Sequence, residues 1–102
     1  MPRLVVLYHQ PADTDAFDAH YRDVHAPIVS RYPNLRTTRL SKLAGVGGRE
    51  PAFYLMAEMA FDSTADLDEA LASEPGAASA KDLHNFAGAG VSIFVAPGEA
   101  DA

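Results

Sequence analysis

The segment AFYLMAEMAF, residues 52–61, carries apolar side chains at both its odd and its even positions. Its composition and the turn-forming residues on either side predict a β-strand. Because successive side chains of a strand point to opposite faces of a sheet, both faces of this strand have to be covered. This requirement constrains the fold more than any other feature of the chain.

Three further strands are expected around this segment, over residues 3–9, 35–43 and 91–96. The Gly-rich residues 44–51 predict the turn between the second and third strands.

Two helical stretches separate the strands. The first begins after Asp13 or Thr14, either of which can cap it. Its apolar stripe has helical spacing and consists of Phe17, Tyr21, Val24 and Ile28. The second begins at Ser63, is interrupted by SEPG at residues 73–76, and ends at Gly88.

The order of elements is βαββαβ, which predicts an α+β, ferredoxin-like fold. We expect a single domain over residues 1–102, with its core in residues 3–96 and a frayed tail over 97–102. Right-handed connections give a four-stranded antiparallel sheet in the order 4-1-3-2, with the helices on one face. Those helices cover only one of the two apolar faces. We therefore expect a homodimer in which the second faces of two sheets pack together.

The composition excludes several kinds of functional site and partner. The chain has no cysteine, which excludes disulfides, thiolate catalysis and cysteine–zinc sites. Its net charge is -6 and no basic face is indicated, so we expect no nucleic-acid partner. The N-terminal apolar run is too short for a signal sequence or a membrane span, so we expect a cytoplasmic protein with no membrane contact. A small molecule or another protein chain is the expected partner.

The end of the first helix, FDAHYRDVHAPIV at residues 17–29, carries the main candidate site. Pro27 should end or kink the helix at Ala26, which places His25 at its C-terminal end. His25 lies about 40° around the helix from Tyr21, on the shoulder of the buried stripe. A histidine there can exchange protons near neutral pH, with Tyr21 orienting a ligand or the imidazole ring. Alternatively, His25 bonds free carbonyls at the helix end and the ring of Tyr21 is ordinary core.

Glu58 interrupts the otherwise apolar third strand and needs a partner for its carboxylate. Alternation places it on the same face as Tyr54 and Met56, and these three residues are the candidate lining of a binding site. The alternative is a structural ion pair with Arg36 or Arg39 on the neighbouring strand.

Neither a metal nor a cofactor is expected. His20 should lie on the solvent side, about 140° from His25, so the two imidazoles cannot chelate together. His84 has no second ligand at the spacing of a known metal motif. The GVGG sequence lies in a hairpin turn, where it cannot bind the phosphates of a nucleotide.

An ordered set of short segments resembles the EthD family of the dimeric α/β-barrel superfamily. It comprises FDAHYRDVHAPIV, with an aromatic-x3-Tyr-x3-His-x-Pro spacing, then YPNLR, AEMAFDSTADLDEAL and KDLHNFAG, within residues 3–96. The first named members of that family are associated with bacterial degradation of fuel ethers alongside a cytochrome P450 system. Similar dimeric barrels include cofactor-free isomerases, cyclases and monooxygenases. Some of these barrels bind haem, but a histidine alone does not establish a haem site in this chain.

The resemblance implies a dimeric α/β barrel and an oxidoreductase-like member that acts on a small hydrophobic or aromatic metabolite. His25, which matches a hallmark histidine, would transfer protons and Tyr21 would orient the substrate, with Tyr54, Met56 and Glu58 lining the pocket. The alternatives are a cofactor-free isomerase or cyclase, and a non-catalytic ligand-binding or accessory protein.

Overall fold

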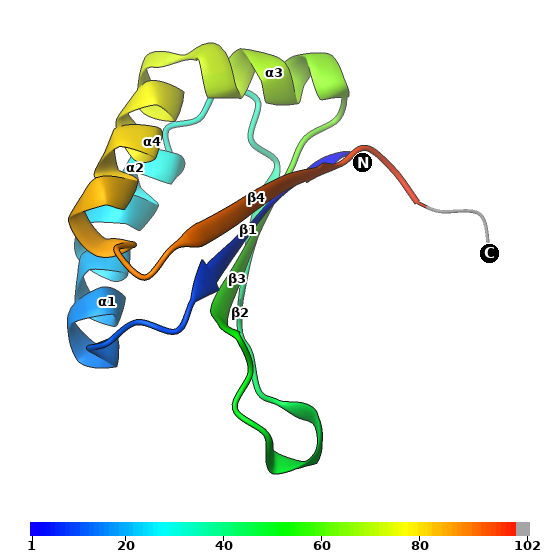
Figure 1. Cartoon of the computed structure of the whole chain (residues 1–102). Helices are drawn as coiled ribbons and strands as arrows, with labels where there is room; N and C mark the ends of the chain where they lie inside the picture. The colour runs from blue at the N-terminus through cyan, green and yellow to red at the C-terminus, as the bar shows by residue number, and fades with distance from the viewer. Residues whose placement is uncertain (100–102) are drawn as a thin grey trace.

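One antiparallel sheet with the strand order β2-β3-β1-β4 organises the computed structural model, which describes residues 1–99 (Figure 1). The strands are β1 (Arg3–His9), β2 (Thr37–Lys42), β3 (Phe53–Ala60) and β4 (Val91–Ala96). This order is the predicted one read from the opposite edge, so the ferredoxin-like α+β topology is confirmed. The predicted fraying of residues 97–102 concerns in part residues 100–102, which lie outside the described residues.

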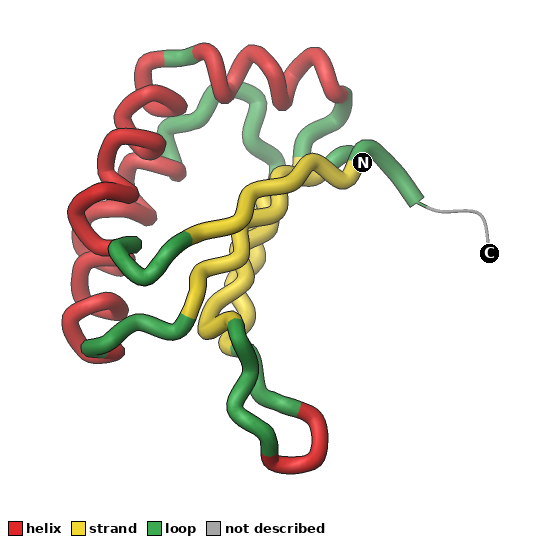
Figure 2. The backbone as a smooth tube through the Cα atoms, viewed as in Figure 1, coloured by secondary structure: helices red, strands yellow, loops and turns green. Residues whose placement is uncertain are grey.

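The helices outside the β2–β3 hairpin all lie on one side of this sheet, as predicted (Figures 1 and 2). They are α1 (Thr14–His20), the π-helical turn η1 (Tyr21–His25), α2 (Ala26–Val29), α3 (Thr64–Ala72) and α4 (Glu74–Phe86), with a short 3-10 turn, η2 (Val46–Gly48), in the β2–β3 hairpin. None of the helices within residues 1–99 is long and apolar enough to cross a membrane.

Side-chain caps fix where the helices begin. Asp13 accepts the N–H of Ala16 at the start of α1, and Ser63 accepts the N–H of Asp66 at the start of α3. Ser73 ends α3 and caps α4, which accounts for the predicted interruption at residues 73–76.

The helix-facing side of the sheet forms the core. Alternate residues of the two central strands are buried there: Leu4, Val6 and Tyr8 of β1, and Leu55, Ala57 and Met59 of β3. Phe61 and Leu67, at the start of the α3 region, are fully buried against them. The predicted placement of the odd positions of β3 under the helices therefore holds from Leu55 onward.

A β-bulge at Tyr54 changes this alternation. Tyr8 pairs with Leu55 but His9 pairs with Phe53, which leaves Tyr54 as the extra residue on β3. Tyr54 consequently turns to the helix side, where its ring meets Phe17 edge-on at 5.5 Å. The prediction that Tyr54 shares a face with Met56 and Glu58 is therefore wrong.

The opposite face of the sheet has an apolar middle beside the Arg3–Glu58 ion pair, and it has no covering element among residues 1–99 (Figure 1). Val5, Leu7, Met56 and Phe94 lie on it in adjacent register, and Phe94 is 57% exposed. The unpaired apolar face expected from the sequence of the third strand is thus present.

Candidate functional site

The first helical stretch changes its hydrogen-bond register at η1. The N–H of Ala26 donates to the carbonyl of Tyr21, five residues back, whereas an α-helix uses four. Pro27 follows immediately, and it lacks an N–H and crowds the carbonyl four residues before it. The predicted end or kink at Pro27 therefore takes the form of a wider turn just before it, and the helix continues to Val29.

This π-helical turn brings two histidines to one carboxylate. Residues five apart lie above one another where the hydrogen bonds span five residues. Nδ1 of His25 is 2.9 Å from Oδ2 of Asp82 on α4, and Nε2 of His20 is 3.0 Å from Oδ1 of the same residue. The prediction that His20 faces solvent is wrong, because it assumed regular α geometry. That the two imidazoles cannot chelate a metal together stays a prediction.

Asp82 is a buried carboxylate with its acceptor positions filled. In addition to the two imidazoles, Nδ2 of Asn85 donates to Oδ1 at 2.9 Å. Burial opposes ionisation of Asp82, but the hydrogen bonds from Asn85, His25 and His20 outweigh it and lower the pKa of this carboxyl. Asp82 is therefore ionised at neutral pH, and each of these groups donates to it.

Asp82 fixes the tautomer of His25. Burial lowers the pKa of His25 more than the neighbouring carboxylate raises it, so the ring is neutral at pH 7. Its single proton sits on Nδ1, and Nε2 is left with a lone pair. That nitrogen lies 3.4 Å from the hydroxyl of Tyr8, which donates to it. Tyr8 keeps its proton because burial raises its pKa.

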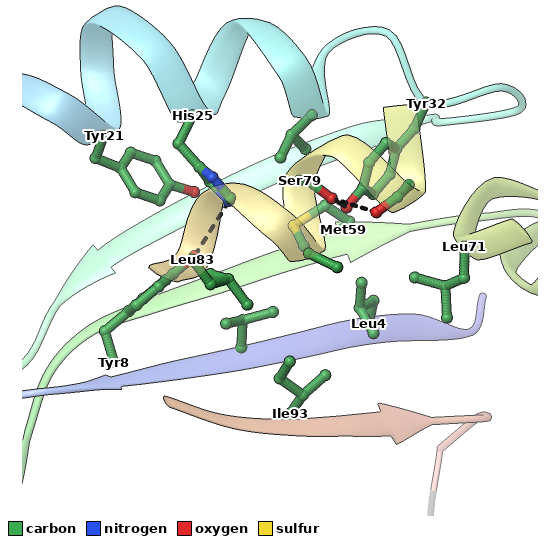
Figure 3. Close-up of a pocket in the computed structure, with 14 residues that line it drawn as sticks. Leu4, Tyr8, Tyr21, His25, Tyr32, Met59, Leu71, Ser79, Leu83 and Ile93 are labelled. Carbon is green, nitrogen blue, oxygen red and sulfur yellow. Dashed lines mark hydrogen bonds between the residues drawn. The ribbon is translucent and has the colours of Figure 1, made fainter. Parts of the chain in front are cut away.

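His25 forms part of the wall of a cavity between α4, η1 and the sheet (Figure 3). The cavity has a volume of about 80 Å³. It is lined by Leu4, Val6, Tyr8, Tyr21, His25, Val29, Tyr32, Met59, Leu71, Gly76, Ser79, Ala80, Leu83 and Ile93. Leu71 and Ile93 are 41% and 51% exposed, which places the mouth between α3 and β4.

Polar groups stand at two ends of this cavity. Tyr8, Tyr21 and His25 form one end, and the hydroxyl of Tyr21 points into the space between helices and sheet (Figure 3). At the other end the hydroxyl of Tyr32 lies 2.5 Å from Oγ of Ser79. Burial raises the pKa of Tyr21 to about 12, so it also remains protonated.

The structure brings together two of the five predicted site residues. His25 and Tyr21 both line the cavity, with ring centroids 5.3 Å apart. Tyr54 instead donates to Asp18 at 2.9 Å and contacts Lys42, outside the cavity. Met56 and Glu58 lie on the opposite face of the sheet.

Glu58 has a structural partner different from the two proposed from sequence. Its Oε2 is 2.9 Å from Nη1 of Arg3 on β1. Arg39 is only its cross-strand neighbour on β2, and Arg36 pairs with Asp62. Glu58 therefore has no direct contact with the His25 cavity.

Sequence reasoning missed Asp82 and Tyr8. The signal for Asp82 was its spacing of three and four residues from Ser79 and Phe86, which places a carboxylate within the buried stripe of α4. Tyr8 could not be recognised as a site residue from sequence, because it lies in a strand with ordinary alternation of buried residues. Among residues 1–99, no group of three or more His, Cys, Asp or Glu side chains is arranged to hold a metal ion.

The chain matches a known protein family. The EthD domain family matches residues 9–90, which include the π-helical turn, Tyr54 and Asp82. The chain belongs to the EthD family. The resemblance read from its motifs is thereby confirmed.

Two similar proteins match nearly the whole chain. An uncharacterized 11.0 kDa protein in the thcB-thcC intergenic region of Rhodococcus erythropolis is 36% identical over 94 residues, covering 92% of this chain and 91% of that protein. The crystal structure of an EthD family protein from Bacillus halodurans has a TM-score of 0.91 at 37% identity, covering 97% of this chain and 99% of that one.

More distant structures share only the fold. SnoaB from Streptomyces nogalater, a cofactor-independent oxygenase, has a TM-score of 0.71 at 13% identity, covering 98% of this chain and 94% of that one. A hydroxynitrile lyase from Passiflora edulis has a TM-score of 0.69 at 18% identity, with 99% and 95% covered. A dimeric ferredoxin-like protein from Thermobifida fusca has a TM-score of 0.69 at 9% identity, with 94% and 89% covered.

Proposed function

We propose that this EthD-family chain binds a small, largely apolar molecule in the His25 cavity and transfers a proton to or from it without a bound cofactor. The observation that carries the proposal is the chain of contacts from Tyr8 through His25 to Asp82 in the cavity wall. A neutral imidazole with a fixed tautomer and an ionised partner is the arrangement of a general base.

The step follows from the positions of the protons. When the bound molecule displaces the hydroxyl of Tyr8 from Nε2 of His25, that nitrogen accepts a proton from a carbon or hydroxyl of the molecule, and the electron pair of the broken bond stays on that molecule. Asp82 stabilises the imidazolium that forms, because it accepts the hydrogen bond from Nδ1. The hydroxyl of Tyr21 donates to the negative charge that develops on the substrate.

Proton transfer alone is sufficient for an isomerisation, a cyclisation or an elimination. An oxidoreductase activity requires in addition dioxygen or another oxidant, with proton removal by His25 as the activating step. SnoaB and the hydroxynitrile lyase support chemistry of this kind on the shared fold, since the former is a cofactor-independent oxygenase and the latter a lyase.

A specific observation favours the second candidate, a non-catalytic ligand-binding or accessory protein. Both nitrogens of His25 already have partners within the chain, as a structural histidine would. In that case the cavity holds a small molecule without changing it.

We further propose that two copies associate through their apolar sheet faces, each covering Val5, Leu7, Met56 and Phe94 of the other. Single exposed apolar residues are common on protein surfaces, but a contiguous set across three strands marks an interface. The dimeric Thermobifida fusca protein supports this arrangement on the same fold.

The base-catalysed ring opening of 5-nitrobenzisoxazole tests the function. A base removes the ring C–H proton, the N–O bond breaks, and a coloured nitrophenolate forms without any cofactor. We expect turnover by the purified protein that His25→Gln abolishes and His84→Gln, at an exposed histidine of α4, retains. Equal turnover by the native protein and His25→Gln would remove the general base and leave the binding role.

A further inference from the structure

We infer that the molecule bound in the His25 cavity is uncharged and carries a hydroxyl or N–H group at the end that lies against Tyr32 and Ser79. This inference rests on the proposed function, because it names the class of molecule for the same cavity.

The hydroxyl protons of Ser79 and Tyr32 are both used in hydrogen bonds within the protein. Oγ of Ser79 donates to the carbonyl of Gly76 at 2.9 Å, so its only proton is committed within α4. Because Ser79 has no second proton, the hydroxyl of Tyr32 donates to Oγ of Ser79. Both oxygens therefore present only lone pairs to the cavity, and they can bind a donor but cannot donate to a carbonyl or an ether.

The other end of the cavity has a different character. Nε2 of His25 is an acceptor that already pairs with the hydroxyl of Tyr8, and the hydroxyl of Tyr21 can both donate and accept. The walls between the two ends are apolar: Leu4, Val6, Val29, Met59 and Leu83. A molecule that matches the cavity therefore has two polar ends joined by an apolar middle, and its donor lies away from His25.

A charged ligand is disfavoured in this cavity. No Lys, Arg, Asp or Glu lines the cavity, so a charged ligand would lose its hydration without gaining a counter-ion. The ionised Asp82 lies directly behind His25 and repels an anion. A carboxylate or phosphate ligand is thus disfavoured twice, and an ammonium ligand would meet no carboxylate in the lining.

Size sets the choice of probe. The cavity of about 80 Å³ opens between Leu71 and Ile93, whose exposed side chains can move aside. An apolar cavity of about 150 Å³ admits benzene, so single-ring compounds are the smallest aromatic probes for this cavity, and movement of the mouth residues has to make room for them.

Three probes of nearly equal size separate these properties: phenol, which is a neutral donor, anisole, in which methylation removes the donor, and benzoate, which is anionic. Binding is measured by titration of amide chemical shifts in nuclear magnetic resonance spectra of the full chain. We expect phenol to shift cavity residues and to bind about tenfold more tightly than anisole, since one buried hydrogen bond is worth about that factor. Benzoate should not bind.

The variant Ser79→Ala tests the donor argument directly. It frees the proton of Tyr32 to bind an ether oxygen, so the preference for phenol over anisole should shrink to about threefold or less. Ser41→Ala, on β2 and away from the cavity, should leave the preference unchanged.

Equal affinities of phenol and anisole, binding of benzoate as tight as that of phenol, or no binding of any probe at millimolar concentration would each overturn the inference. Binding is read without turnover, so it separates this inference from the proposed chemistry. His25→Gln that still binds phenol but has lost ring-opening activity supports both proposals. Native protein that prefers phenol but has no activity keeps the inference and removes the base.

Discussion

Nδ1 of His25 lies 2.9 Å from Oδ2 of Asp82, and this contact joins the first helical stretch to α4. The same carboxylate accepts from His20 and Asn85, so the site is held by groups from two separate helices. Phe86 packs against both imidazole rings, with centroids 4.9 Å from His20 and 4.8 Å from His25. Protonation of the site and packing of the helices are consequently coupled.

Stability should fall as the pH is lowered from 7 to 5. The folded-state pKa of His25 lies below its ordinary value of 6.5, so below that pH the unfolded chain binds more protons and is favoured. A single group contributes a slope of at most about 1.4 kcal/mol per pH unit. Asp82, whose pKa is lowered from 3.8, adds a loss of the same sign only at more acidic pH.

Urea unfolding at a series of pH values measures this effect. His25→Gln should flatten the dependence between pH 7 and 5, while His84→Gln should follow the native curve. A native stability that stays constant over this range would contradict the burial of a neutral His25.

Asp82→Asn should impair any His25-dependent reaction. The amide cannot supply the charge that stabilises the imidazolium, so we expect ring-opening activity to fall at least about tenfold. The apparent pKa of the base in the pH–rate profile should also move further down, because Asp82 raises the pKa of His25. Asp23→Asn, at an exposed carboxylate on the same helical stretch as His25, serves as the control and should change neither quantity.

Gly76→Ala should destabilise the corner between α3 and α4. A methyl group at this position would lie 2.3 Å from the carbonyl oxygen of Ala70 and 2.6 Å from that of Leu71. The backbone would have to move, at a cost of about 1–3 kcal/mol. Gly88→Ala, where nothing lies within 4 Å of the added carbon, should be close to neutral. Thermal unfolding of both variants compares them, and similar melting temperatures would contradict the close approach.

Leu67→Ala should cost about 2–5 kcal/mol, because Leu67 is fully buried and its truncation leaves a cavity under α3. Leu71→Ala on the same helix should cost clearly less, about 1 kcal/mol or below, since Leu71 is 41% exposed. Denaturant titrations in parallel provide the comparison. A cost for Leu71→Ala equal to that for Leu67→Ala would show that α3 is packed differently.

Phe94→Asp should convert the proposed dimer to a monomer, because it places a charge within the apolar part of the uncovered sheet face. Val46→Asp, at the exposed tip of the β2–β3 hairpin, is the matched control and should remain dimeric. Sedimentation velocity distinguishes the two states. A native chain that sediments as a monomer, or a Phe94→Asp variant that stays dimeric, would refute association through this face.

The layered architecture could be predicted from sequence because strand and helix periodicity survive in it. The first and last strands begin and end at the predicted residues, Arg3–His9 and Val91–Ala96. The apolar positions of the third strand correctly indicated one covered and one uncovered face. Short-range patterns are sufficient for features of this kind, since each depends only on which side of an element is apolar.

The positions of Tyr54 and His20 could not be predicted from sequence, and the reason is the same for both. Alternation placed Tyr54 with Glu58, but the bulge turns Tyr54 to the other face. The helical wheel placed His20 far from His25, but the π-helical turn brings both to Asp82. In each case the backbone departs from its regular period by one residue. Pro27 marks the place in the helix, but neither local sequence shows that the change is one residue.

The π-helical turn has an evolutionary consequence. Such a turn holds one residue more than regular α geometry between fixed ends, so loss of one codon within residues 22–24 would restore an unbroken helix in the correct reading frame. The helix would still join the same strands, and His20 and His25 would then be four residues apart, on one face of a regular helix. A descendant of this kind would keep the architecture and the pairing of both histidines with Asp82, and would lose only the widened turn, in a single genetic event.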